Sequence, residues 1–114
     1  RRAFYRSMIN SEYLFAQYSF RKCLPQHLAP GARQQLINKS LYSTWSVVLS
    51  TVSPEEVSSV LQRGVLAAAL AEALKEDDDY FNAVSYKTND RSVLEVAFRK
   101  AEKLLDVYMA SVSV

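Results

Sequence analysis

The sequence predicts an all-α fold: one domain, an antiparallel bundle of four helices, or five if one of them breaks. Glycine and proline are scarce, with 2 and 3 in 114 residues, whereas an all-β domain of this size would need many turn residues. Apolar residues also recur at steps of three and four along most of the chain, which is the period of one helix face. Because the chain opens at Arg1 without a methionine, we expect residues 1–114 to be a piece of a longer or processed polypeptide.

Residues 3–24 are predicted to form the first helix, since they contain no glycine or proline and Pro25 follows them. The predicted core-facing line consists of Tyr5, Ile9, Tyr13, Ala16, Phe20 and Cys23. Four further apolar residues lie off that line, namely Phe4, Met8, Phe15 and Tyr18. An apolar arc this wide exceeds what one core face requires, so part of it is expected to face a partner.

A second helix is predicted over residues 32–52, with Trp45 in the middle of its apolar stripe and buried. Ser53, Pro54 and Glu56 then have the spacing of a helix start, with a serine cap, a proline in the first turn and a glutamate that can reach back to the cap. We therefore expect a third helix to begin at Pro54.

Gly64 interrupts the third helix and predicts either a bend or a break there. Residues 76–90 are acidic with embedded aromatics, and are expected to be an irregular loop or one or two helical turns. Beyond them, Asn89, Asp90 or Ser92 is expected to cap the last helix. Its stripe is the most regular in the chain and consists of Leu94, Phe98, Ala101, Leu105, Tyr108 and Val112.

The charge distribution is uneven although the net charge is only +2. Residues 1–50 carry seven lysines and arginines and one glutamate, and residues 51–114 carry seven basic and eleven acidic groups, so the halves are +6 and −4. Six of the thirteen aromatic residues also lie within the first 24 residues. Basic and aromatic residues together are typical of surfaces that bind a protein or unpaired nucleic-acid bases.

Patterns of catalysis are missing from the sequence. It has no nucleophile elbow, P-loop or dinucleotide glycine motif, so we do not expect an enzyme or a bound cofactor. Cys23 and His27 are four residues apart, but Pro25 lies between them, and no metal site is expected there. The acidic run 76–79 lacks the alternating ligands of a calcium loop. The longest apolar run, residues 65–71, is shorter than a membrane span. The cellular location is left open.

Two short segments are similar to known families. Tyr42-Ser-Thr-Trp45, followed by Ser53-Pro-Glu-Glu-Val57 and Leu61, resembles the tryptophan half of the WY-type fold of secreted oomycete effectors. Residues 97–112 are similar to the last helix of the extrinsic four-helix subunits of photosystem II. Each resemblance covers about a quarter of the chain or less. We assign no family from them.

The function that these observations favour is a non-catalytic helical interaction module, an accessory or adaptor domain that docks on another protein through its first helix or associates with itself. The alternative is binding of RNA or single-stranded nucleic acid by the basic half. The predicted contact residues comprise the apolar anchors Phe4, Met8, Phe15 and Tyr18 and the rim charges Arg2, Arg6 and Arg21.

Overall fold

The computed structural model describes residues 2–112, without the side chains of residues 111 and 112. The elements in this range are helical, which confirms the predicted fold class, but there are six α-helices rather than four or five. The helices are α1 (Arg2–Phe15), α2 (Lys39–Val48), α3 (Pro54–Val60), α4 (Val65–Glu76), α5 (Asp78–Ser85) and α6 (Arg91–Val112). Short 3-10 turns span Ala16–Tyr18, Pro25–Leu28 and Leu49–Thr51.

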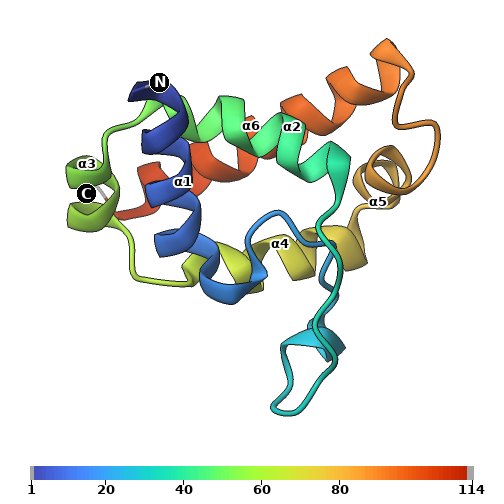
Figure 1. The fold of residues 1–114 in the computed structure, drawn as a ribbon, viewed down its shortest axis with the longest axis horizontal. Helices are drawn as coiled ribbons and strands as arrows, with labels where there is room; N and C mark the ends of the chain where they lie inside the picture. The colour runs from blue at the N-terminus through green and yellow to red at the C-terminus, as the bar shows by residue number, and fades with distance from the viewer. Residues whose placement is uncertain (1, 113–114) are drawn as a thin grey trace.

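The longest helix, α6, packs against α2 and α5 (Figure 1). Helix α1 lies across the end of α2 and the 3-10 turn that follows it (Figure 1). The segment between the second 3-10 turn and α2 extends away from the helical body (Figure 1). An isolated antiparallel bridge between Arg21 and Ile37 ties the base of this segment together.

The first two helices are shorter than the sequence predicts. α1 ends at Phe15, because Ala16 takes a left-handed backbone conformation with a φ of 52°, and the chain then turns back toward the core. α2 begins at Lys39 rather than at residue 32, because the side chain of Asn38 accepts the backbone N–H of Leu41 and caps the helix there. Both boundaries therefore follow from local backbone chemistry that interrupts the apolar period.

The predicted third helix is broken into α3 and α4, because Leu61 is extended after α3 and Gly64 directly precedes α4. The φ of Gly64 is 77°, and its backbone N–H donates to the carbonyl oxygen of Tyr13 at 2.7 Å, so α4 starts at this point against α1. The two helices meet at 81°. The predicted start at Pro54 is confirmed, and the hydroxyl of Ser53 accepts the N–H of Glu56 at 3.1 Å. The predicted bend or break at Gly64 is a break.

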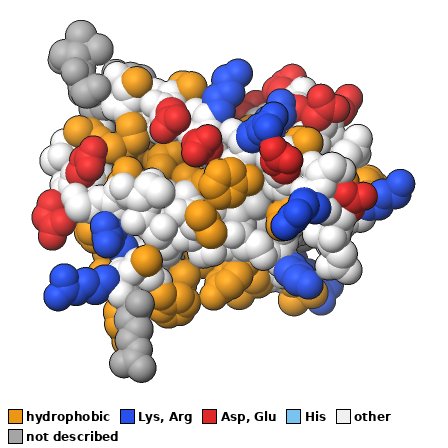
Figure 2. Space-filling model, turned by 90° about the horizontal axis from the view of Figure 1, so that it is seen from above, with side chains coloured by type: hydrophobic (Ala, Val, Ile, Leu, Met, Phe, Trp, Pro, Cys, Tyr) orange, Lys and Arg blue, Asp and Glu red, His pale blue; other side chains and the backbone are white. Residues whose placement is uncertain are grey.

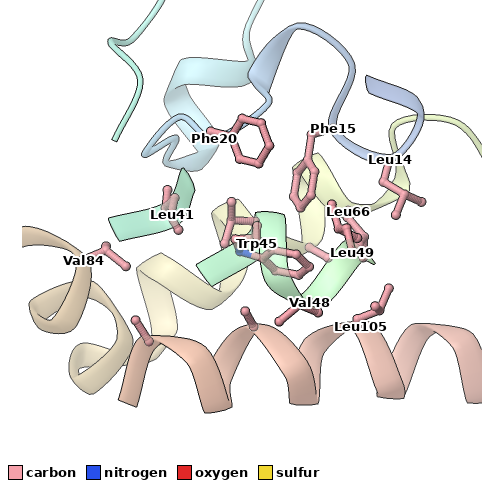
Figure 3. Close-up of a cluster of buried hydrophobic side chains, with 14 of the residues drawn as sticks. Leu14, Phe15, Phe20, Leu41, Trp45, Val48, Leu49, Leu66, Val84 and Leu105 are labelled. Atoms are coloured by element: carbon pink, nitrogen blue, oxygen red, sulfur yellow. The ribbon is translucent and has the colours of Figure 1, made fainter. Parts of the chain in front are cut away.

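The core surrounds Trp45, whose predicted burial is confirmed. The ring of Phe15 meets the Trp45 indole edge-on, with 5.0 Å between the ring centroids, and points into the labelled cluster (Figure 3). Leu49, Leu66 and Leu105 lie around the same indole. Within residues 76–90, the stretch Asp78–Ser85 is helical, and its Tyr80 is also buried in this core. Of the two alternatives predicted for this acidic segment, a loop or helical turns, the structure therefore confirms the helical one.

No single helix within the described residues is both long and apolar enough to cross a membrane. The pair α3 and α4 reaches that length and composition only when taken together, across their bend.

Candidate interaction surface

Helix α1 turns three of its polar residues inward. Ser7, Asn10 and Ser11 are buried with about 1% of each side chain exposed, whereas Tyr5 is 63% and Ile9 is 54% exposed. This is the reverse of the sequence prediction, in which Tyr5 and Ile9 belonged to the core-facing line. That part of the predicted core is therefore wrong, although the helix itself is present.

The reason for the inversion lies at the end of α2. The last carbonyl groups of a helix have no donors within the helix and need partners from elsewhere. The side-chain amide of Asn10 donates to the carbonyl oxygens of Leu49 at 2.9 Å and Val52 at 3.0 Å, and the hydroxyl of Ser7 donates to the carbonyl oxygen of Ser46. Helix α1 is thus oriented by the hydrogen bonds that it supplies to the backbone around the end of α2, and Tyr5 and Ile9 are left on the outside.

The exposed side of α1 carries a row of four residues that we call the outer stripe: Arg2, Tyr5, Ile9 and Glu12. All four are exposed in the structure. Phe4 flanks the row, 51% exposed, with its ring edge-on to that of Tyr5 at a centroid distance of 6.0 Å. The stripe therefore has an apolar middle, a basic end and an acidic end.

A notch of about 250 Å³ lies beside the stripe, between α1 and α3. Ile9 and Tyr13 form one wall, and Pro54, Glu55 and Ser58 form another. Tyr13 is fixed in place because its hydroxyl donates to the carbonyl oxygen of Leu61 at 2.9 Å. The notch is large enough to receive one apolar or aromatic side chain of a partner.

Figure 2 shows the molecule from above, with exposed hydrophobic side chains on this face. They are interspersed with acidic and basic groups and do not form one continuous patch (Figure 2). Val47 and Val107 are exposed elsewhere on the surface, on α2 and α6. The outer stripe differs from such single residues because its apolar members are consecutive on one helix face.

The seven contact residues predicted from the sequence do not form one surface. Phe4 and Arg2 are exposed as predicted. Met8, Arg6, Tyr18 and Arg21 are half-buried, and Met8 packs on the core. Phe15 was predicted to be an exposed anchor, but it is 1% exposed and contacts Trp45, so that prediction is wrong. Its inward position follows from the end of α1, where the chain turns into the core.

The basic residues that follow α1 are engaged within the chain. The guanidinium of Arg21 donates to the carbonyl oxygen of Gln35. The ammonium of Lys22 donates to the hydroxyl of Ser85 at 3.1 Å and lies over the ring of Phe81 at 5.1 Å from its centroid. These two cations thus hold the chain after α1 against the extended segment and α5.

Cys23 and His27 both line a hollow of about 440 Å³ beneath the extended segment. The imidazole Nδ1 of His27 accepts the backbone N–H of Leu24 at 2.9 Å. Burial raises the pKa of the Cys23 thiol, and the charge of Arg21 acts in the opposite direction with a smaller effect. A buried thiol with a raised pKa is a poor nucleophile and a poor metal ligand at neutral pH. Among the residues that the structure describes, no three metal-ligating side chains come together.

The acidic residues before α5 have a structural position. The carboxylate of Asp77 accepts the N–H of Tyr80 at 3.2 Å and pairs with the ammonium of Lys100 on α6 at 2.8 Å. The hydrogen bond from Lys100 is the main reason why the pKa of Asp77 is lowered. Asp77 therefore caps α5 and ties it to α6.

A larger groove of about 640 Å³ lies between α5 and α6. Its walls include Ala83, Val93 and Val96, and its rim carries Asp79 and Lys87. Two further cations on the rim, Arg99 and Lys100, already pair with carboxylates of the chain. The groove consequently offers no clear preference for a ligand of either charge.

A comparison with models of known families, with curated proteins and with solved structures finds no match to this chain.

The residues of the outer stripe that the sequence prediction missed are Tyr5, Ile9 and Glu12. One signal for them was present: Ser7, Asn10 and Ser11 have the spacing of one helix face, and all can bond to a carbonyl group. Such a polar line is usually the solvent face of a helix. Only the structure shows that the accepting carbonyl groups belong to the end of α2 and to the 3-10 turn and the residue that follow it.

Proposed function

We propose that this protein is a non-catalytic helical interaction module that binds a protein partner through the outer stripe of α1. The observation that carries the proposal is the inversion of α1, which buries Ser7 and Asn10 and leaves Tyr5 and Ile9 to solvent. Exposed apolar residues on consecutive helix turns favour burial against another surface.

The composition of the stripe supports a protein partner. Tyrosine and arginine are the residue types that most often dominate binding energy at protein interfaces, and the stripe contains one of each. Tyr5 and Ile9 are four residues apart, so their side chains meet on the helix surface and can bury as a unit. The adjacent notch supplies the concave complement that anchoring side chains require.

Binding of RNA or single-stranded nucleic acid remains the alternative, with weaker support. Arg21 and Lys22 make hydrogen bonds within the chain, so they are less free to contact phosphates than the sequence predicts. Salt distinguishes the two functions, because binding to phosphates weakens steeply with salt concentration whereas an apolar protein contact does not.

The proposal is tested with two stripe variants, Tyr5→Ser and Ile9→Ser, and with Val107→Ser as the control. Val107 is 52% exposed on α6, so its replacement removes a comparable apolar side chain that is not part of the stripe. All three variants should keep the melting temperature within about 2 °C of the wild type, since exposed substitutions have small effects on stability.

Each variant is then immobilised and compared with the wild type for the proteins that it retains from the native source. The stripe variants should lose a specific partner that the wild type and Val107→Ser retain. Equal retention by all four proteins would show that the outer stripe is not the contact surface.

A further inference from the structure

We propose that the partner of the outer stripe is a second copy of this chain, with the two α1 helices packed antiparallel across a two-fold axis; this inference rests on the function proposed above. The relevant observation is the spacing of the stripe. Arg2, Tyr5, Ile9 and Glu12 are separated by steps of three, four and three. This spacing reads the same from either end.

A palindromic spacing has a direct geometric consequence. When two copies of such a helix are laid side by side in opposite directions, each position meets the position that mirrors it. Arg2 of one copy then lies opposite Glu12 of the second copy, and Tyr5 lies opposite Ile9 of the second copy. Every contact of the row occurs twice, as a two-fold axis requires.

Charge selects the antiparallel direction. In a parallel pair, Arg2 would face Arg2 of the second copy and Glu12 would face its own equivalent, so both ends would repel. In the antiparallel pair both ends attract, because a cation meets a carboxylate at each of them. One flanking residue has the same polarity, since Glu55 lines the notch beside the acidic half of α1.

The notch offers a binding site for the Tyr5 side chain of the second copy. It lies next to Ile9 and is walled by Tyr13 and Pro54. In the antiparallel pair, Tyr5 of the second copy is opposite Ile9 and thus at the mouth of the notch. An aromatic side chain seated in a hollow is the usual form of an anchor at an interface.

The expected dimer is weak. α1 has 14 residues and is therefore about 21 Å long at 1.5 Å per residue. One such helix from each copy buries less than the roughly 1,600 Å² of a standard stable interface. The chain should consequently be monomeric when dilute and dimeric when concentrated.

The first experiment is sedimentation equilibrium of the purified chain from about 10 μM to about 1 mM at low salt, where charged contacts are least screened. Arg2→Glu and Glu12→Arg are each expected to raise the dissociation constant roughly tenfold, because each places like charges opposite one another at both ends. An equimolar mixture of the two variants should restore the wild-type affinity, since every end of the mixed dimer then pairs opposite charges. Lys103→Glu, an exposed change on α6, should leave the affinity unchanged.

Neither stripe variant is expected to disturb folding. A carboxylate at the N-terminal end of a helix and a guanidinium near its C-terminal end both interact favourably with the helix dipole. Circular dichroism of each variant checks this, and a helical spectrum equal to that of the wild type makes any loss of association attributable to the stripe.

The direction of pairing is tested by disulfide formation. Arg2→Cys mixed with Glu12→Cys should cross-link under mild oxidation, whereas Arg2→Cys alone should not, because the two copies of position 2 are about 15 Å apart along the axis. The native Cys23 is buried and does not compete. Cross-linking of Arg2→Cys with itself, without cross-linking of the mixture, would overturn the antiparallel arrangement.

A wild-type chain that stays monomeric at about 1 mM, or a dimer that is insensitive to both charge reversals, overturns the second-copy proposal. The function proposed above fails on a different result, namely equal partner retention by Ile9→Ser and the wild type. The two proposals can therefore be rejected separately.

Discussion

The indole Nε1 of Trp45 donates a hydrogen bond of 3.0 Å to the hydroxyl of Tyr80 in the buried centre of the molecule. This bond joins α2 to α5 and satisfies two polar groups that would otherwise be costly to bury. Together with the capping of α5 by Asp77, it explains why an acidic segment is folded onto the core rather than left as a loop.

Removing the Tyr80 hydroxyl should leave the Trp45 N–H buried without its acceptor. We expect Tyr80→Phe to lower the free energy of unfolding by about 1 to 3 kcal/mol, the usual penalty for a buried donor that loses its partner. Urea denaturation of both proteins measures this. Tyr86→Phe is the matched control, because Tyr86 is exposed, and it should change the stability by less than about 0.5 kcal/mol.

Alkaline pH should destabilise the fold through two buried acids. Burial raises the pKa of Tyr80 well above its ordinary value of 10.0, and burial also raises the pKa of Cys23 above 9.0. Above these ordinary values the unfolded chain loses protons that the folded chain keeps, so stability falls as pH rises. Stability should be unaffected by these two groups below pH 9 and should decline above it, first through Cys23 and then through Tyr80.

Urea midpoints at about pH 8 and at about pH 11 measure this decline, and the contribution of Tyr80 should be near 1.4 kcal/mol per pH unit once its unfolded form has titrated. Tyr80→Phe should decline less steeply than the wild type over the same range. An equal slope in both proteins would mean that Tyr80 ionises as easily in the folded state as in the unfolded state.

The parts of the fold that were predicted correctly are those with local causes. The serine cap at Ser53 and the proline at Pro54 start a helix wherever they occur, and the glycine at Gly64 weakens one. Burial of Trp45 follows from its place in an apolar stripe. The ends of α1 and α2 were missed, because Ala16 and Asn38 interrupt helices through backbone conformation and capping that the apolar period does not report.

The candidate surface was misplaced for a reason that is not local. From the sequence, Ser7 and Asn10 belong on the solvent side of α1 and Tyr5 on the core side. Their positions are exchanged because the side-chain amide of Asn10 donates to the carbonyl groups of Leu49 and Val52, which lie under α1. A side-chain hydrogen bond to backbone 39 or 42 positions away cannot be recognised from the apolar pattern of the helix that donates it.

The same relationship predicts a stability effect at Asn10. Asn10→Ala removes the hydrogen bonds from its side-chain amide to the carbonyl groups of Leu49 and Val52, so we expect a loss of about 1 to 3 kcal/mol. Asn82→Ala is the control on α5, where the side chain is exposed. The melting temperature of Asn10→Ala should be clearly lower than that of Asn82→Ala. If the two melting temperatures are equal, the amide of Asn10 contributes nothing to the orientation of α1.

Gly64 should not tolerate a side chain. A Cβ atom at this position meets no other atom within 4 Å, so the cost comes from the left-handed backbone alone. We expect Gly64→Ala to destabilise the protein by about 1 to 2 kcal/mol. A stabilising effect in urea denaturation would instead indicate that the helix passes through this position without a break.

The final prediction separates the buried and exposed apolar residues of α1. Phe15 packs edge-on against Trp45 with 1% of its side chain exposed, so Phe15→Ala should cost about 3 to 5 kcal/mol as a large core truncation. Ile9 is 54% exposed on the same helix, so Ile9→Ala should cost less than about 0.5 kcal/mol. Urea denaturation of dilute protein measures both without a contribution from association. If the two costs are equal, or if Ile9→Ala is the larger, then Ile9 is a core residue and the outer stripe is not free to bind a partner.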